Sequence, residues 1–271
     1  MDIDFPLVLS WAVLISGAIW LFDVLVLRPR RRRAAEALAS SGTHDDDVNR
    51  VLAEPKLVEY ARSFFPVLLV VLLLRSFVAE PYQIPSESML PTLEVGDFIL
   101  VNKYAYGLRL PVLGTKIMEV GEPQRGDVMV FIPPHDPRYF IKRVIGLPGD
   151  HLRYQNQALF INGDRAGYDL VEEFEVHLAM ANTTVPIREY LETLNHNTHR
   201  IYRYPFTEPV QEWVIPEGAY FMMGDNRGRS EDSRVWGPAR EELIVGKAVA
   251  IWLHKEPGFA LPTLSRNRWL D

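Results

Sequence analysis

The sequence predicts a mainly β protein, in which two N-terminal transmembrane helices precede an antiparallel β-rich domain that carries a smaller inserted β subdomain. Three observations indicate this arrangement. The apolar residues of the first 80 positions fall in two dense blocks. A charged segment separates these blocks. Beyond residue 80 the helical period gives way to short β-branched or aromatic runs that end near Gly-Asp pairs, as expected for strands joined by turns.

The composition excludes several classes of function. The 271-residue chain has a formal net charge of -6, and its one dense arginine cluster lies beside an apolar segment. This distribution argues against nucleic-acid binding, which needs clustered positive charge on the folded domain. The chain has no cysteine, which excludes disulfides, thiolate metal sites and cysteine nucleophiles. Its histidines do not form an HExxH metalloprotease pattern, and we expect neither a metal nor a cofactor.

The first element is a membrane-spanning helix over residues 5–27, preceded by a short extracytoplasmic N-terminus at residues 1–4. Phe5 to Phe22 comprises 18 uncharged and mostly apolar residues, and the run continues to Leu27, which is enough to cross about 30 Å of hydrocarbon. A cleavable signal peptide is the alternative, but the chain opens without the basic segment of such a peptide and the apolar run is too long. An excess of arginine marks the cytoplasmic side of a membrane helix. That excess follows directly, at Arg28, Arg30, Arg31, Arg32 and Arg33.

Residues 28–61 are therefore expected to form a cytoplasmic basic and polar loop, in which residues 40–50 lack the apolar content of a packed core. The second transmembrane helix is predicted at residues 62–79. Its apolar part has only 12 uncharged residues, from Ser63 to Leu74, and also fits a buried core helix. It spans the membrane if Arg75 extends to the far interface, and Pro66 is then expected in its first turn. Residues 80–271 would be extracytoplasmic.

The β-rich domain is predicted from short apolar runs. We expect strands at 98–101, 128–132, 139–145, 220–223 and 248–253. Residues from about 151 to 213 are richer in polar residues and alternate less clearly, so we expect an inserted subdomain there, with a hairpin near Gly163. Residues 172–181 and 187–194 suit short helices. His196 and His199 lie among loop-forming residues and are expected on the solvated surface.

Two of the predicted elements carry candidates for nucleophilic chemistry. Ser86 and Ser88 lie in a proline-rich segment, which suits either a rigidly held nucleophile or a turn that joins the helix to the domain. Lys142 lies in an apolar strand, where its side chain and that of Arg143 point to opposite faces. Burial lowers a lysine pKa from about 10.4 by roughly 3 to 5 units, which turns lysine into a usable base. A surface position or an ion pair is the alternative for Lys142.

The third candidate is a dense polar loop over residues 224–234. Loops of this kind often serve function. So many short hydrogen-bonding residues between two apolar strands suit either a solvated turn or a network that orients a buried amine.

Together these segments resemble the bacterial type I signal peptidases, the leader peptidases of the serine-lysine family S26. The residues that carry the resemblance are Ser86 to Leu93, Gly96-Asp97, Lys142-Arg143 with Gly146 to Asp150, and Gly224 to Arg234. The resemblance implies a membrane-bound endopeptidase that removes N-terminal signal peptides after Ala-x-Ala sites through an acyl-enzyme. Its expected partners are exported preproteins and the phospholipid membrane, with transient proximity to the export translocon and no nucleic acid. Its expected place is the bacterial inner membrane, with the catalytic domain on the periplasmic side.

The resemblance also implies roles for individual residues. Ser88 would be the nucleophile and Lys142 the general base, while the Ser86 hydroxyl and the Ser88 backbone N–H would form the oxyanion hole. Ser230 would orient the base. A structural ion pair is implied for Asp232 and Arg234, and substrate pockets for Tyr82, Ile84, Met89, Leu93, Phe140 and Ile141.

Two departures from the family pattern leave the proposed catalytic groups in place. Gly228-Arg229 stands where relatives commonly have Asp-Asn, and the cysteine pair of some relatives is absent. Two other functions are open on the residues alone. One is a catalytically silent membrane protein that binds exported chains. The other is a self-cleaving regulatory protease with a serine and a lysine, which the two anchors and the lack of a DNA-binding segment oppose.

Overall fold

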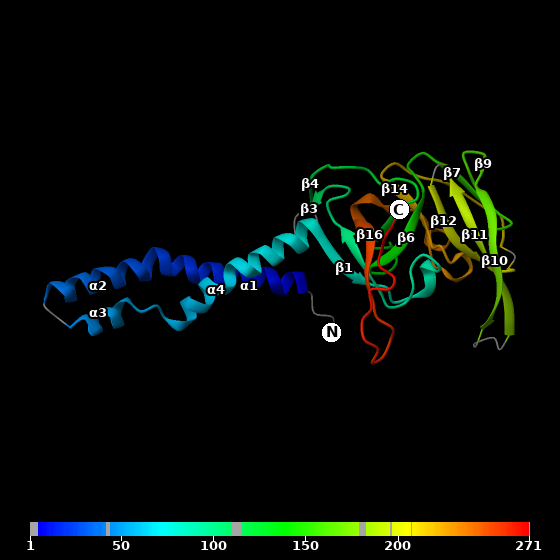
Figure 1. Cartoon of the computed structure of the whole chain (residues 1–271). Helices are drawn as coiled ribbons and strands as arrows, with labels where there is room; N and C mark the ends of the chain where they lie inside the picture. The colour runs from blue at the N-terminus through cyan, green and yellow to red at the C-terminus, as the bar shows by residue number, and fades with distance from the viewer. Residues whose placement is uncertain are drawn as a thin grey trace. The chain divides into compact units, whose positions relative to one another are not determined.

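The computed structural model describes residues 5–41, 44–109, 115–178, 183–195, 197–206 and 208–270. The chain divides into two compact units (Figure 1): a helical unit of residues 1–78 with 109–115, and a β unit of residues 79–108 with 116–271. This division confirms the predicted fold class of two long apolar N-terminal helices followed by an antiparallel β-rich domain.

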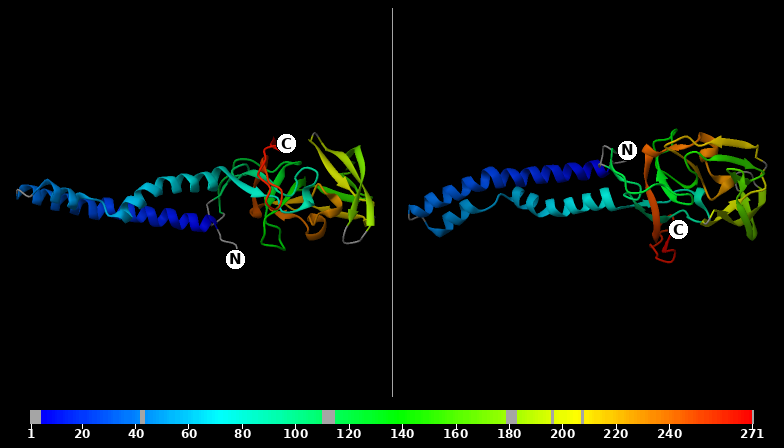
Figure 2. Two further views of the ribbon diagram at one scale, coloured as in Figure 1. Left: turned by 60° about the horizontal axis from the view of Figure 1, so that its bottom comes forward. Right: turned by 90° about the horizontal axis from the view of Figure 1, so that it is seen from above.

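The helical unit contains two segments that are long and apolar enough to cross a membrane, over residues 7–40 and 56–76. Most of each segment is exposed, unlike a core helix of a soluble protein. Along the chain the helices are α1 (Phe5–Phe22), η1 (Asp23–Leu27), α2 (Arg28–Ser40), α3 (Asp45–Leu52), α4 (Lys56–Leu73) and η2 (Leu74–Val78). Helices α1 and α4 lie side by side in both views of Figure 2.

Small and aromatic residues form the contact between α1 and α4. A Cβ atom on Gly17 would lie 2.8 Å from the ring of Phe65, so only glycine allows this approach. The ring of Trp20 packs on the same phenylalanine, with the two ring centroids 5.5 Å apart. The prediction that Pro66 lies in the first turn was wrong, because α4 begins at Lys56 and places this proline inside the helix. The charged residues that precede the apolar run extend the helix, and membrane helices tolerate an internal proline.

The β unit is built on an antiparallel sheet with the strand order β1-β2-β16-β5-β6-β14-β15, and β17 pairs with β16. Its strands are β1 (Ala79–Gln83), β2 (Asp97–Asn102), β5 (Val128–Phe131), β6 (Phe140–Gly146), β14 (Ala219–Met223), β15 (Ala239–Arg240), β16 (Ile244–His254) and β17 (Arg268–Trp269). Alternate residues of β5 enter two different core clusters, so both faces of this strand are buried. The five predicted strands all belong to this sheet.

Three smaller sheets complete the β unit. Strands β10 (Gly167–Leu178), β11 (Thr183–Leu194) and β12 (Asn197–Arg203) form one sheet; β13 (Gln211–Val214), β7 (His151–Gln155), β8 (Ala158–Ile161) and β9 (Asp164–Arg165) form a second; β3 (Leu108–Arg109) and β4 (Lys116–Met118) form a third. The predicted hairpin near Gly163 joins β8 to β9. Asn162 and Gly163 both have positive φ values, 54° and 94°, as a two-residue hairpin turn requires.

The predicted short helices at 172–181 and 187–194 are wrong, because residues 172–178 and 187–194 belong to the long strands β10 and β11; residues 179–181 lie outside the described residues. The pairing of these strands extends from Gly167 opposite Thr193 to Leu178 opposite Thr183. Strand β11 buries Ile187 and Glu189 on one face and Glu192 and Leu194 on the other. Long-range pairing therefore overrides the weak local pattern.

Candidate active site

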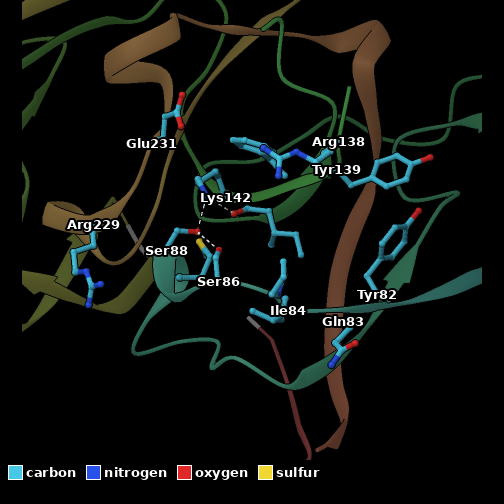
Figure 3. Close-up of a pocket in the computed structure, with 14 residues that line it drawn as sticks. Tyr82, Gln83, Ile84, Ser86, Ser88, Arg138, Tyr139, Lys142, Arg229 and Glu231 are labelled. Atoms are coloured by element: carbon cyan, nitrogen blue, oxygen red, sulfur yellow. Dashed lines mark hydrogen bonds between the residues drawn. The ribbon is translucent and has the colours of Figure 1, made fainter. Parts of the chain in front are cut away.

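A cavity of about 600 Å³ lies between β1 and β6 (Figure 3). It contains both predicted serines, the predicted lysine base and five of the six predicted pocket residues. The sixth, Leu93, is fully buried in the core and does not line the cavity. The lining residues are Tyr82, Gln83, Ile84, Pro85, Ser86, Ser88, Met89, Arg138, Tyr139, Phe140, Ile141, Lys142, Arg229 and Glu231.

The turn that carries Ser88 is held from two sides. It forms the short helix η3 (Glu87–Met89), and the buried side chain of Met89 anchors this helix in the core. On the other side, Asn226 donates a hydrogen bond from Nδ2 to the Glu87 carbonyl oxygen at 2.9 Å and one from its backbone N–H to the Ser88 carbonyl oxygen at 3.1 Å. The backbone on both sides of the Ser88 hydroxyl is therefore tied to the polar loop.

The Lys142 amine lies 2.6 Å from Ser88 Oγ. Among the described residues it also donates a hydrogen bond to the carbonyl oxygen of Ile141 at 3.1 Å. The Ser86 hydroxyl lies 3.3 Å from Ser88 Oγ. Ser88 Oγ thus lies within hydrogen-bond reach of both an amine and a second hydroxyl group, an arrangement that suits covalent catalysis.

Burial makes the neutral form of the Lys142 amine accessible near neutral pH. The side chain is 4% exposed, and this burial lowers its pKa to about 8. The negative charges of Asp232, Asp225 and Glu231 act in the opposite direction and raise the pKa. A pKa near 8 leaves a usable fraction of neutral amine close to neutral pH.

The neighbouring Arg143 is held in a buried ion pair. Its guanidinium contacts Asp225 at 2.7 Å, and both groups are almost fully buried. The same carboxylate accepts a hydrogen bond of 2.5 Å from Thr92. This ion pair connects strand β6 to the polar loop. The Arg143 side chain therefore points away from that of Lys142, which contacts Ser88.

Asp232 and Arg234 form an ion pair at 2.9 Å. The Asp232 side chain also accepts a hydrogen bond from the backbone N–H of Arg234 and so caps helix α5 (Ser233–Trp236). It accepts another from the backbone N–H of Gly224 at 3.0 Å. Burial alone would raise the pKa of Asp232, but the Arg234 guanidinium holds it below its ordinary value.

Ser230 lies on the same loop with its hydroxyl oxygen buried. By strict geometry this oxygen has no hydrogen-bond partner in the described part of the chain, although the hydroxyl lies near enough to Asp232 to help lower the pKa of that carboxyl. The contacts of the Lys142 amine go to Ser88 and Ile141. Gly224 lies next to this hydroxyl. A Cβ atom there would collide with Ser230 Oγ and come within 2.5 Å of the Ser88 carbonyl oxygen. Only glycine allows the loop to pass this close to the Ser88 turn.

A buried ionic cluster behind the loop was missed by the sequence analysis. His199 was expected at the surface, but it is 7% exposed and its Nε2 lies 3.0 Å from Glu192. Burial lowers the pKa of His199, with a further decrease from Arg143. Glu192 also forms a close ion pair with Arg227. The alternation of β12, which places His199 and Ile201 on one face, is the signal that indicates its burial; His196 lies outside the described residues.

Edges of two strands border the cavity. Strand β14 pairs with the part of β6 from Arg143 to Gly146, so residues 140–142 have no strand partner on that side among the described residues. In the described part of the chain, strand β1 lies at the end of the sheet, with β2 as its strand partner. Strand edges of this kind can bind an extended peptide as an added strand.

Comparisons with known proteins show which family the chain resembles. The family model described as signal peptidase, peptidase S26, matches residues 57–253. The chain is 47% identical to signal peptidase I of Pseudomonas aeruginosa and 48% identical to that of Pseudomonas fluorescens, in both cases over 98% of each chain. It is 34% identical to signal peptidase I of Haemophilus influenzae, over 93% of this chain and 86% of the relative. A crystal structure of a signal peptidase I from Enterococcus faecalis covers 48% of this chain and 98% of its own, at 30% identity and a TM-score of 0.30.

Proposed function

Because the chain belongs to the signal peptidase family, peptidase S26, we propose that Ser88 and Lys142 form the catalytic dyad with which it removes signal peptides. The activity of the family is that of signal peptidase I, a serine endopeptidase. The observation that carries the proposal is the 2.6 Å contact between the Lys142 amine and Ser88 Oγ. This contact joins a nucleophile to an amine whose pKa is lowered to about 8.

In the proposed mechanism neutral Lys142 accepts the proton of the Ser88 hydroxyl as Ser88 Oγ attacks the scissile carbonyl carbon. The oxyanion that forms accepts hydrogen bonds from the Ser86 hydroxyl and the Ser88 backbone N–H. The protonated Lys142 amine then donates its proton to the leaving amine, and an acyl-enzyme remains on Ser88. Lys142 next accepts a proton from water, which attacks the ester, and it returns this proton to Ser88 Oγ as the ester bond breaks and the signal peptide leaves with a free carboxylate.

The two strand edges beside the cavity support an extended substrate. A peptide that pairs with β1 and with residues 140–142 would present alternate side chains to the cavity. Ile84, Met89 and Ile141 lie where the side chains before the cut would bind. Large apolar side chains on both edges leave room for small residues, so alanine at the first and third positions before the cut would fit. Tyr82 and Phe140 would complete these pockets.

The protein is an inner-membrane protein with two candidate membrane helices. We propose that its N-terminus is outside, that residues 28–61 are cytoplasmic and that the β unit is periplasmic. The five arginines after the first apolar run support this orientation. The proposed partners are exported preproteins, the phospholipid membrane and, transiently, the export translocon.

The test is cleavage of a preprotein with an Ala-x-Ala site by the purified protein in detergent. We expect Ser88→Ala and Lys142→Ala each to abolish cleavage. The matched controls Ser265→Ala and Lys255→Ala replace an exposed and a partly exposed residue outside the cavity and should cleave like the wild type. Cleavage by Lys142→Ala at the wild-type rate would refute the dyad. Peptide binding without cleavage by any folded variant, wild type included, would favour the silent binding protein.

The same assay tests the two supporting serines. Ser86→Ala should lower kcat by roughly 10²- to 10³-fold if its hydroxyl is an oxyanion donor. Ser230→Ala should cause a smaller loss, because this residue is proposed to orient the base and does not react. Unchanged turnover in either variant would remove the role proposed for that serine.

A further inference from the structure

The two ends of the cavity differ in chemical character. At one end lie Tyr82, Ile84 and Tyr139, on or beside the strand edges of β1 and β6. At the other end the polar loop contributes the charged residues Arg229 and Glu231. Figure 3 shows Arg229 on the side of Ser88 opposite to Tyr82 and Tyr139. The first end also contains Arg138, whose guanidinium is held in an ion pair by Asp136. A peptide bound across Ser88 would therefore extend from a mainly apolar end, where the one arginine is paired with its neighbour, to an end that carries Arg229 and Glu231.

The direction of the substrate follows from the proposed function, on which this inference rests. The residues before the cut are small and apolar and would bind at the end with Ile84 and Ile141. The chain after the cut starts at the leaving amine and would extend over the opposite end. Its first residues would therefore pass Arg229, which departs from the family pattern noted in the sequence.

Arg229 differs from the other two arginines of the polar loop in its exposure. Arg227 and Arg234 are held in ion pairs with Glu192 and Asp232, in which both partners are buried. Arg229 pairs with Glu87 at 2.5 Å, and both of these side chains are 47% exposed. An ion pair that water solvates on both sides contributes little stability. A carboxylate from the substrate can therefore bind Arg229 together with Glu87 or in place of Glu87.

We propose that Arg229 is a specificity-determining residue that favours an acidic side chain among the first three residues after the cut. The guanidinium has five N–H donors and binds a carboxylate through two parallel hydrogen bonds. Glu87 competes for the same donors and limits the preference. Glu231 lies at the same end of the cavity, pairs with His135 at 3.1 Å and acts against an acidic residue. The preference for an acidic side chain therefore depends on how the charge of Arg229 compares with the opposing charges of Glu87 and Glu231.

The experiment uses the full-length protein in detergent and a series of preproteins with one Ala-x-Ala site. Glu, Gln or Lys is placed in turn at each of the first three positions after the cut. For the wild type we expect kcat/KM for Glu to exceed that for Gln by about twofold to fivefold at one or more positions, the range of an exposed ion pair. This ratio should fall as the salt concentration rises, because salt screens exposed charges.

Substitutions test whether Arg229 causes the preference for an acidic side chain. Arg229→Gln should bring the Glu-to-Gln ratio to about one, and Arg229→Glu should reverse it in favour of Lys. Glu87→Gln should increase the ratio, because it removes the competing carboxylate. Arg240→Gln is the matched control, since Arg240 also forms an exposed ion pair, with Glu242, but does not line the cavity. Its ratio should equal that of the wild type.

The outcomes separate this inference from the proposed function. If wild type cleaves the Gln substrates but prefers neither charge, or if Arg229→Gln keeps the preference, the inference is wrong and the peptidase activity stands. A wild-type preference for Lys would assign the dominant charge to Glu87 and Glu231 and would also overturn it. If wild type cleaves none of the preproteins, the proposed function itself fails.

Discussion

At the residue scale, the basicity of Lys142 depends on opposing influences. Burial lowers its pKa, while three carboxylates, those of Asp232, Asp225 and Glu231, raise it. Asp232 and Asp225 are buried and held by arginines. Glu231 is exposed, lines the cavity and has only His135 as an ion-pair partner among the described residues. Glu231 is therefore the carboxylate that can be neutralised without breaking a buried ion pair.

The pH dependence of cleavage tests this account. Activity requires the neutral amine, so kcat/KM of the wild type should rise with pH through about 8. Glu231→Gln removes a negative charge that stabilises the protonated amine, so the pKa should fall and the rising limb should move to lower pH. The measurement is a pH profile of kcat/KM. Glu217→Gln replaces an exposed carboxylate outside the cavity and should leave the limb in place. A shift to higher pH would contradict the proposed coupling.

The sequence allowed Lys142 to be singled out because a lysine in an apolar strand is a local signal. It gave no measure of how deeply the amine is buried, since its burial depends on residues far away in the sequence. His199 shows the limit of this reasoning. Its neighbours are turn formers, and the short alternation with Ile201 is the only local sign of its burial, which depends on the pairing of β12 with β11.

At the element scale, the Ser88 turn and the loop after β14 approach each other at Gly224. A Cβ atom at this position would collide with Ser230 Oγ and with the Ser88 carbonyl oxygen. Both neighbours belong to segments that hold proposed catalytic groups. The hydrogen bonds from Asn226 tie the same two segments together.

Gly224→Ala should therefore displace Ser88 from Lys142. A misplacement of about 1 Å lowers turnover by roughly 10²-fold, so we expect a loss of that order in kcat. Thermal unfolding in detergent would show whether the variant is folded. The matched control is Gly167→Ala in β10, where the new Cβ atom would lie 3.3 Å from the Thr193 side chain and far less crowded than at Gly224. Wild-type turnover by folded Gly224→Ala would show that the loop can yield without moving the dyad.

The elements that could be predicted are those with a strong local pattern. The strands of the main sheet are short apolar runs that end at turn residues. The hairpin at Asn162-Gly163 is predicted by these two residues, which favour the positive φ values of a tight turn. Strands β10 and β11 are rich in glutamate and threonine and alternate weakly, so only their pairing identifies them as strands. The start of α4 was also missed, because the charged residues from Lys56 to Arg62 extend the helix beyond its apolar run.

At the scale of the whole molecule, the two units are built for different surroundings. The β unit buries its apolar residues in its own core clusters. The helical unit exposes most of its apolar residues, which a membrane would cover. Within the first segment, Asp23 is buried and forms an ion pair with Arg31 at 2.6 Å, so its charge is not left alone beside the apolar run. The helical unit therefore requires lipid or detergent around it, and which side of the membrane each end faces becomes the decisive question.

The lack of cysteine makes the orientation directly measurable, because any introduced cysteine is the only thiol in the chain. Ser40→Cys places an exposed thiol at the end of α2, and Ser265→Cys places one near the C-terminus of the β unit. In intact spheroplasts a membrane-impermeant maleimide should label Ser265→Cys and spare Ser40→Cys. Both variants should be labelled after lysis. The unsubstituted protein, which has no cysteine, should be labelled neither before nor after lysis. The reverse pattern would place the β unit in the cytoplasm, where it could not reach signal peptides on the far side of the membrane, and would contradict the proposed topology.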